Sequence, residues 1–148
     1  MENIKHKTVF NGFIKLLCLT LLITLVNLGI RVEMNGMWLW GMPKAENVTS
    51  VTIKYPSLTD EVKEITDREE IERCVNMSGL LRYKPFADTE GKDVPLITFY
   101  YHLDNDDQIE VSANATAVFY NGKKHMLKYK NLFVNVVESV FYPEPVHE

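Results

Sequence analysis

An uninterrupted apolar run near the N-terminus constrains this chain more than any other feature of its sequence. From Leu16 to Ile30, fifteen consecutive residues (LLCLTLLITLVNLGI) carry no charge. Phe13 and Ile14 extend the run to eighteen, because the long side chain of Lys15 can carry its ammonium group out to a polar boundary. At about 1.5 Å per residue such a helix covers about 27 Å, close to the thickness of a bilayer hydrocarbon core. We therefore predict a transmembrane anchor over residues 13–30.

The residues before this run set its expected orientation. Lys5, Lys7 and Lys15 lie among residues 1–15, against one acidic residue, Glu2. Basic residues flank transmembrane helices on the cytoplasmic side. We therefore expect residues 1–12 in the cytoplasm and the rest of the chain outside, as a single-pass protein of the cell membrane.

A cleaved signal peptide is the alternative, because a basic segment followed by about fifteen apolar residues fits that description as well. Cleavage requires small residues at the −3 and −1 positions, and neither Asn27 with Gly29 nor Pro43 with Ala45 is a good pair. Cys18 lies too early, and lacks the preceding small residues, for a lipoprotein signal. We expect the helix to be retained.

Residues 31–50 are expected to form an interfacial segment and a stalk. Trp38 and Trp40 follow the apolar run, and tryptophan is enriched where membrane meets water; the alternative is that they cap the domain. The folded domain is then expected over residues 51–148, about the size of one ordinary domain.

The domain is acidic, with 12 Lys and Arg against 18 Asp and Glu over residues 44–148. Nucleic-acid binding needs clustered cations, and none is evident along the sequence, so no nucleic-acid partner is expected. The two cysteines exclude an intramolecular disulfide, because Cys18 lies in the apolar run and Cys74 in the domain. Cys74 shares a helical face with Ile71 and Val75, so we expect it in the core.

Alternation and capping signals predict the first elements of the domain. Residues 51–55 alternate apolar and polar side chains until Pro56, as a half-buried strand does. Thr66-Asp67-Arg68-Glu69 is a capping-box pattern, and apolar residues follow at helical spacing until Gly79, which predicts a helix over 67–78. Residues 82–95 contain two prolines and no periodicity, which predicts a long loop.

Two hairpins and a second helix are predicted after this loop. Residues 97–103 and 109–112 alternate, and keeping their apolar residues on one face requires an odd loop, with Asn105-Asp106-Asp107 placing Leu103 opposite Ile109. Asn121-Gly122 predicts a tight turn between strands 115–120 and 123–129, with Val118 opposite His125. Asn131 precedes an apolar stripe that predicts a helix over 132–141, although its valines leave a strand as the alternative.

These elements predict an α+β domain in which two helices pack on one face of an antiparallel meander sheet, after an N-terminal transmembrane helix. The other face is then left open. The polar residues expected on this open face are Thr98, His102, Gln108, Glu110 and Ser112.

No strong catalytic or cofactor motif is present, since the glycines are scattered and HExxH, CxxC and GxSxG are missing. His102 with Asp104, Asp106 and Asp107 has carboxylates at alternate positions, as a calcium loop does. The required glycine is replaced by Ile109, and Asn and Asp form hairpin turns without metal. We therefore expect no catalytic, cofactor or metal residues.

The sequence favours an interaction or sensing module without catalytic activity, whose partner is an envelope protein. The candidate interaction surface comprises Thr98, His102 and Glu110 of the open face together with two aromatic residues, Tyr83 and Phe86. The alternatives are an envelope protein that binds a small ligand or a metal, and an uncharacterised enzyme.

The second half of the domain resembles a group of bacterial proteins. The run ITFYYHLDNDDQIEVSANATAVFYNGKKHMLKY followed by NLFVNVVESVF is similar to the C-terminal half of small extracytoplasmic domains of unknown function in Firmicutes, which are membrane-anchored proteins and lipoproteins. The resemblance covers Val51 to Phe141 and rests on the succession of strands, turns and helix. It implies a bacterial, exported domain and assigns no active site. This chain differs in lacking a lipobox.

Overall fold

The computed structural model describes residues 2–91 and 93–143, with the backbone alone for residues 2–10. The chain forms two compact units, Met1–Asn35 and Gly36–Glu148. Met1 and residues 144–148, the outer ends of two of the expected ranges, lie outside the described residues. The elements in chain order are α1 (Glu2–Asn35), the short 3-10 helix η1 (Ala45–Asn47), β1 (Val48–Lys54), β2 (Val62–Ile65), α2 (Arg68–Ser78), β3 (Ile97–Leu103), β4 (Gln108–Ala113), β5 (Ala117–Tyr120), β6 (Lys123–Met126) and α3 (Leu132–Phe141).

The first unit is one continuous helix, α1, that contains the predicted apolar segment. Its apolar part, Asn11–Asn35, has a mean hydropathy of 2.2, and none of the residues in its most apolar window is buried within the protein. The polar side chains in it bond to the helix itself: Thr24 Oγ1 donates to the Thr20 carbonyl at 2.8 Å and Asn27 Nδ2 to the Ile23 carbonyl at 2.8 Å. By length and composition α1 can cross a membrane, and a signal sequence would meet the same description.

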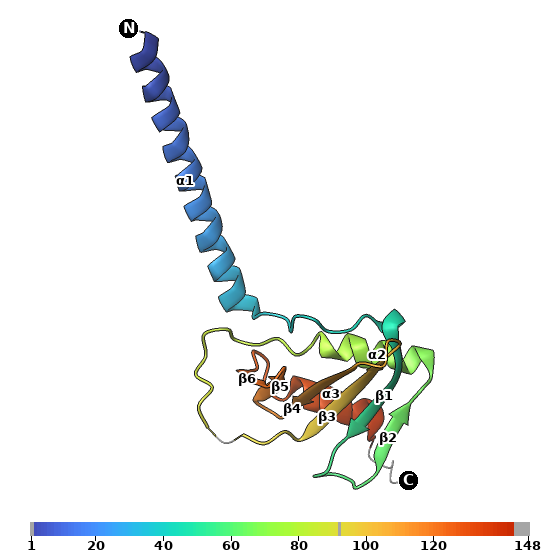
Figure 1. Ribbon diagram of the computed structural model, residues 1–148. Coiled ribbons are helices and arrows are strands. Elements are labelled where there is room, and N and C mark those ends of the chain that lie inside the picture. Colours follow the sequence, from blue (N-terminus) through green and yellow to red (C-terminus); the bar gives the residue numbers. More distant parts are fainter. Residues whose placement is uncertain (1, 92, 144–148) are drawn as a thin grey trace. The chain divides into compact units, whose positions relative to one another are not determined.

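The second unit contains a six-stranded antiparallel sheet in the order β2-β1-β3-β4-β5-β6 (Figure 1). The predicted α+β class and meander are confirmed. The start of the sheet differs from expectation in two ways: β1 begins at Val48 rather than Val51, and the strand β2 was not predicted. The strand β2 escapes the alternation test because Val62 and the next two residues are exposed and Ile65 alone is buried.

Both domain helices pack on the face of the sheet that carries the odd-numbered residues of β3. The Phe99 ring contacts Phe133 and Phe141 of α3, with ring centroids 5.5 and 6.5 Å apart. The Tyr101 hydroxyl donates to the Cys74 carbonyl of α2 at 3.0 Å and shares a hydrogen bond with Ser78 Oγ. Because adjacent odd residues of one strand contact different helices, the predicted one-sided arrangement is confirmed.

Cys74 belongs to this core, as predicted. Its side chain is fully buried. Burial, and after it the nearby charge of Glu70, raises the pKa of the Cys74 thiol to about 12. The thiol therefore stays protonated and packs as a small apolar group.

The two helix starts differ from their predicted caps in detail. Asp67, rather than Thr66, caps α2, and its carboxylate accepts from the Glu70 N–H at 3.0 Å. Asn131 does stand at the N-cap of α3, with φ of 61°, but its side chain makes no capping hydrogen bond. The predicted helices are present, and each begins one residue after its cap.

The β3–β4 hairpin has the predicted odd loop in a different register. Tyr101 lies opposite Ile109, and the Leu103 N–H donates to the Asp107 carbonyl at 2.9 Å. The predicted pairing of Leu103 with Ile109 is therefore wrong by two residues. The loop is Asp104-Asn105-Asp106, and Asp106 adopts a φ of 65°. A shift by two keeps every side chain on its predicted face.

The β5–β6 hairpin turns at Asn121-Gly122, as predicted. Both residues have positive φ, 49° and 70°, as a type I′ turn requires. Val118 lies opposite His125, which confirms the predicted register. The strand ends differ, because β6 stops at Met126 rather than Tyr129 and Leu127 pairs with another segment.

The segment that pairs with Leu127 contains Tyr83, and it joins the expected stalk to the domain. Tyr83 forms antiparallel bridges to both Leu127 and Met37, and Met37 and Tyr83 exchange two N–H to carbonyl hydrogen bonds of 2.8 Å. Leu39 is buried in the core. The compact unit thus begins at Gly36, well before the expected boundary at residue 51.

Gly36 is required at this junction for two reasons. Its φ is +72°, a conformation that residues with a side chain rarely adopt. A Cβ placed there would lie 2.9 Å from the Tyr83 carbonyl oxygen, which is closer than real contacts allow. Glycine alone fits between α1 and the Met37 bridge.

Substitution Gly36→Ala is expected to destabilise the domain by about 1–2 kcal/mol, the cost of the left-handed conformation for an L-residue. Near-ultraviolet circular dichroism of the detergent-solubilised chain during urea unfolding would measure this. Gly29→Ala is the matched control, since nothing lies within 4 Å of a Cβ at that position. Equal unfolding midpoints for the two variants would contradict the steric account.

Candidate functional site

The sheet face turned away from the helices carries neighbouring polar and aromatic side chains from several strands. The strand register places Thr52 beside Tyr100 and Tyr100 beside Glu110. Residues two positions away along each strand lie on the same face. We call this surface the open face and define it by its residues: Thr52, Lys54, Thr98, Tyr100, His102, Gln108, Glu110, Ser112 and Phe119.

Hydrogen bonds join neighbouring strands across the open face. Thr52 Oγ1 and His102 Nε2 are 2.9 Å apart, which links β1 to β3. Thr98 Oγ1 and Ser112 Oγ are 2.9 Å apart, and Ser112 Oγ donates to Glu110 Oε1 at 3.2 Å. These side chains are held in place before any partner arrives, which lowers the entropy that a partner would have to offset.

Tyr100 lies at the centre of the open face between opposite charges. The Lys54 ammonium lies 4.9 Å from the centroid of the Tyr100 ring, within the range of cation–π attraction. Burial raises the pKa of Tyr100 above its ordinary value, and the Glu110 carboxylate raises it further. The phenol therefore stays protonated and can donate a hydrogen bond outward.

The open face holds shallow depressions. One of about 320 Å³ is lined by Thr52, Lys54, Tyr100, His102 and Gln108 and is widely open to solvent. A second, of about 420 Å³, extends from β4 to the β5–β6 turn and is lined by Gln108, Ile109, Glu110, Phe119, Tyr120, Asn121 and Gly122. Shallow, mixed surfaces of this kind suit a polypeptide better than a small molecule, which is usually enclosed on most sides.

The structure brings together three of the five predicted surface residues. Thr98, His102 and Glu110 lie on the open face. Tyr83 lies beyond β6, where its ring packs on His125 with centroids 4.3 Å apart. Phe86, which is 85 % exposed, lies on the loop after α2.

Sequence reasoning missed Thr52 and Lys54. The alternation in β1 did indicate that Thr52 and Lys54 share a face. It could not show that β1 lies beside β3, because β2 and α2 separate the two strands along the chain.

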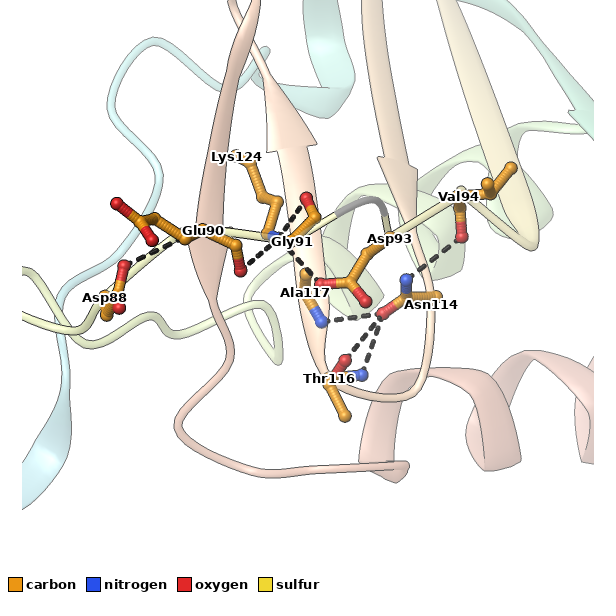
Figure 2. Close-up of polar contacts among 9 residues, drawn as sticks. All are labelled: Asp88, Glu90, Gly91, Asp93, Val94, Asn114, Thr116, Ala117 and Lys124. Carbon is orange, nitrogen blue, oxygen red and sulfur yellow. Dashed lines mark hydrogen bonds and ion pairs between the residues drawn. The ribbon is translucent and has the colours of Figure 1, made fainter.

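The predicted long loop is tied down onto β6. Lys124 Nζ forms an ion pair with Asp93 at 2.7 Å and donates to the carbonyls of Gly91 at 3.1 Å and Glu90 at 3.4 Å (Figure 2). Only 12 % of the Lys124 side chain is exposed, so these contacts are partly shielded from water.

Asn114 holds the end of the same loop against the β4–β5 turn. Its Nδ2 donates to the Val94 carbonyl at 3.0 Å, while its Oδ1 accepts from the N–H groups of Thr116 at 2.9 Å and Ala117 at 2.7 Å (Figure 2). The loop is thus an ordered part of the domain at both points.

The acidic hairpin turn is organised by its own side chains. Asn105 Nδ2 donates to Asp107 Oδ2 at 2.7 Å, and Asn105 Oδ1 accepts from the Asp107 N–H at 3.2 Å. Among residues 11–91 and 93–143, no three His, Cys, Asp or Glu side chains are grouped as a metal site would group them.

Comparison of the chain with protein-family models, with curated proteins and with solved structures finds no match. The function must therefore be inferred from the geometry of this chain.

Substitution Lys124→Gln is expected to release the loop over residues 88–94, because it removes the ion pair with Asp93 and weakens the bonds to two carbonyls. Amide hydrogen exchange in this loop should accelerate several-fold while exchange in β3 stays unchanged. Lys123→Gln is the control, since Lys123 is an exposed neighbour in the same strand. Unchanged loop exchange in Lys124→Gln would show that other contacts hold the loop.

Proposed function

We propose that this protein is a membrane-tethered, extracytoplasmic interaction or sensing module that binds an envelope protein through the open face and has no catalytic activity. The observation that carries the proposal is the open face itself. It presents hydrogen-bonded polar groups and the Tyr100 ring on one face of the sheet, next to an open rather than an enclosed depression.

Retention of α1 as the anchor is supported by the way the domain begins. Removal of the chain up to Ala45 would take away Met37, which pairs with Tyr83, and Leu39, which is buried in the core. A mature domain cut there would lack part of its own packing. The lysines before α1 favour a cytoplasmic N-terminus and an exterior domain.

The absence of catalytic activity is supported by how the polar groups of the open face are used. His102 Nε2 is bonded to Thr52, and Glu110 accepts from Ser112. A general acid or base needs a positioned group that faces the reacting atoms within a pocket. These groups bond to one another along the sheet, and the depression beside Thr52 and His102 is widely open to solvent.

Site-specific photocrosslinking tests the partner proposal. A photoreactive phenylalanine at Gln108, an exposed open-face position, is expected to trap a discrete protein adduct in intact cells. The matched control places the same group at Glu72, an exposed position on α2. Identical adduct patterns at the two positions, or no adduct at Gln108, would remove the support for the open face as an interface.

A small-ligand binder is the second candidate, favoured by the 320 Å³ depression, whose volume is at the lower end for ligand pockets. A ligand that binds the folded state at 100 times its Kd raises stability by about 2.7 kcal/mol. Thermal unfolding across a panel of metabolites and divalent cations would detect this. A rise in the melting temperature that Tyr100→Ala abolishes would favour this candidate over a protein partner.

The topology has its own test. In intact cells, protease added outside is expected to remove an epitope tag placed at the C-terminus and to leave a tag at the N-terminus protected. The mass of the untreated membrane-bound protein should be that of the full chain. A mass smaller by about thirty to forty-five residues would show instead that a signal peptide is removed.

A further inference from the structure

Positive charge in this acidic domain is concentrated in two segments. Residues 79–87 contain Arg82 and Lys84, and residues 115–137 contain four lysines; neither segment has a single Asp or Glu. The acidic residues of the domain all lie elsewhere in the chain. The domain has a net negative charge, but all the Asp, Glu, Lys and Arg residues within these two segments are basic.

The fold places these two segments side by side. The Lys84 N–H donates to the Met126 carbonyl at 2.9 Å, and the Lys128 N–H donates to the Arg82 carbonyl at 2.7 Å. We call the resulting surface the basic edge and define it by Arg82, Lys84, Lys123, Lys128 and Lys130. The pairing beyond β6 thus brings Arg82 and Lys84 to the lysines that lie close together within residues 123–130.

Lysines of the basic edge are available to a partner. Lys84, Lys123 and Lys130 are exposed, and within residues 11–91 and 93–143 they have no ion-pair partner. Lys124 is excluded from the edge because Asp93 already neutralises it. Burial lowers the pKa of His125, and the charge of Lys123 lowers it further, so His125 stays neutral and the charge comes from lysine and arginine.

Two exposed tryptophans belong to the same surface. The Arg82 guanidinium lies 4.2 Å from the Trp38 ring, and Trp38 is 57 % exposed. Trp40, 82 % exposed, lines a depression of about 290 Å³ together with Tyr83, Lys123 and His125. Indole rings next to cations are the combination that binds at the headgroup level of a bilayer.

The covalent chain brings this surface to the end of α1. Met37 pairs with Tyr83, which lies between Arg82 and Lys84 of the basic edge. One glycine separates Met37 from Asn35, the last residue of α1. Two residues span about 7 Å at most. If α1 crosses a membrane, as proposed above, the basic edge begins within the headgroup region.

We propose that the basic edge, with Trp38 and Trp40, docks the domain onto the anionic phospholipid headgroups of the membrane that α1 anchors it in. This inference rests on the proposed tether and adds a defined contact between the domain and the lipid. The negative charge of the rest of the domain would be repelled by the same headgroups, so docking through this edge also selects one orientation.

The tryptophans supply the probe, because Trp38 and Trp40 are the chain's two tryptophans. The full chain is reconstituted into phosphatidylcholine vesicles with or without phosphatidylglycerol, each containing a brominated phosphatidylcholine as quencher. We expect stronger quenching in the phosphatidylglycerol vesicles, and a loss of this difference in high salt. The triple variant Lys84→Gln, Lys123→Gln, Lys130→Gln should lose the difference as well, since each lysine near an anionic surface contributes about fivefold to the docked population.

The matched control removes three exposed cations from elsewhere in the domain: Lys44→Gln, Arg68→Gln and Arg73→Gln. It should keep the dependence on phosphatidylglycerol. Equal quenching in both lipids, or equal loss in the two triple variants, would overturn docking while leaving the tether intact. Failure of the protein to float with the vesicles would overturn the tether and, with it, this inference.

Discussion

Burial of alternate residues of β3 beneath two helices is the constraint on which the rest of the domain depends. Phe99 and Tyr101 are fully buried, and they connect the sheet to α3 and α2 respectively. Full burial of an aromatic side chain contributes about 1.5–3 kcal/mol, so a register shift that exposed both would cost a large part of a typical domain's stability. Because side chains alternate, fixing the odd residues of β3 inside also fixes Tyr100 and His102 outside. The candidate site is a consequence of the core.

The two edges of the sheet are protected in different ways. The β2 edge is polar, and its Lys63 ammonium donates to the Phe141 carbonyl at the end of α3 at 2.6 Å, where a helix favours a cation. The β6 edge continues into Leu127, which Tyr83 covers, and Tyr83 is in turn covered by Met37. Unpaired edges invite pairing with other chains, so both arrangements keep the domain from joining its sheet to a neighbour.

The elements that depend on interactions between residues close in sequence were predicted from local sequence patterns. The alternation of β3 and β4, the Asn121-Gly122 turn and the apolar stripe of α3 each needed only short-range information, and each is present. The predicted register of the acidic hairpin is wrong by two residues. Alternation shows which face a side chain lies on, but it cannot distinguish two registers that differ by an even number of residues. The strand β2 was missed because a polar edge strand has no apolar period. The lysines at 123–130 lie close together in the sequence, but the addition of Arg82 and Lys84 to them could not be predicted, since it depends on hydrogen bonds between segments about 45 residues apart.

The bridge between Met37 and Tyr83 has a mechanical consequence. Gly36 is the one residue between α1 and this bridge along the chain, so tension on the chain would reach the bridge directly after α1. A partner that pulled on the open face would load the two Met37–Tyr83 hydrogen bonds before the force reached β1. Rupture of these two bonds would lengthen the tether only as far as Leu39, because Leu39 is buried in the core. The junction would thus release a short length of chain under tension while the core stays folded.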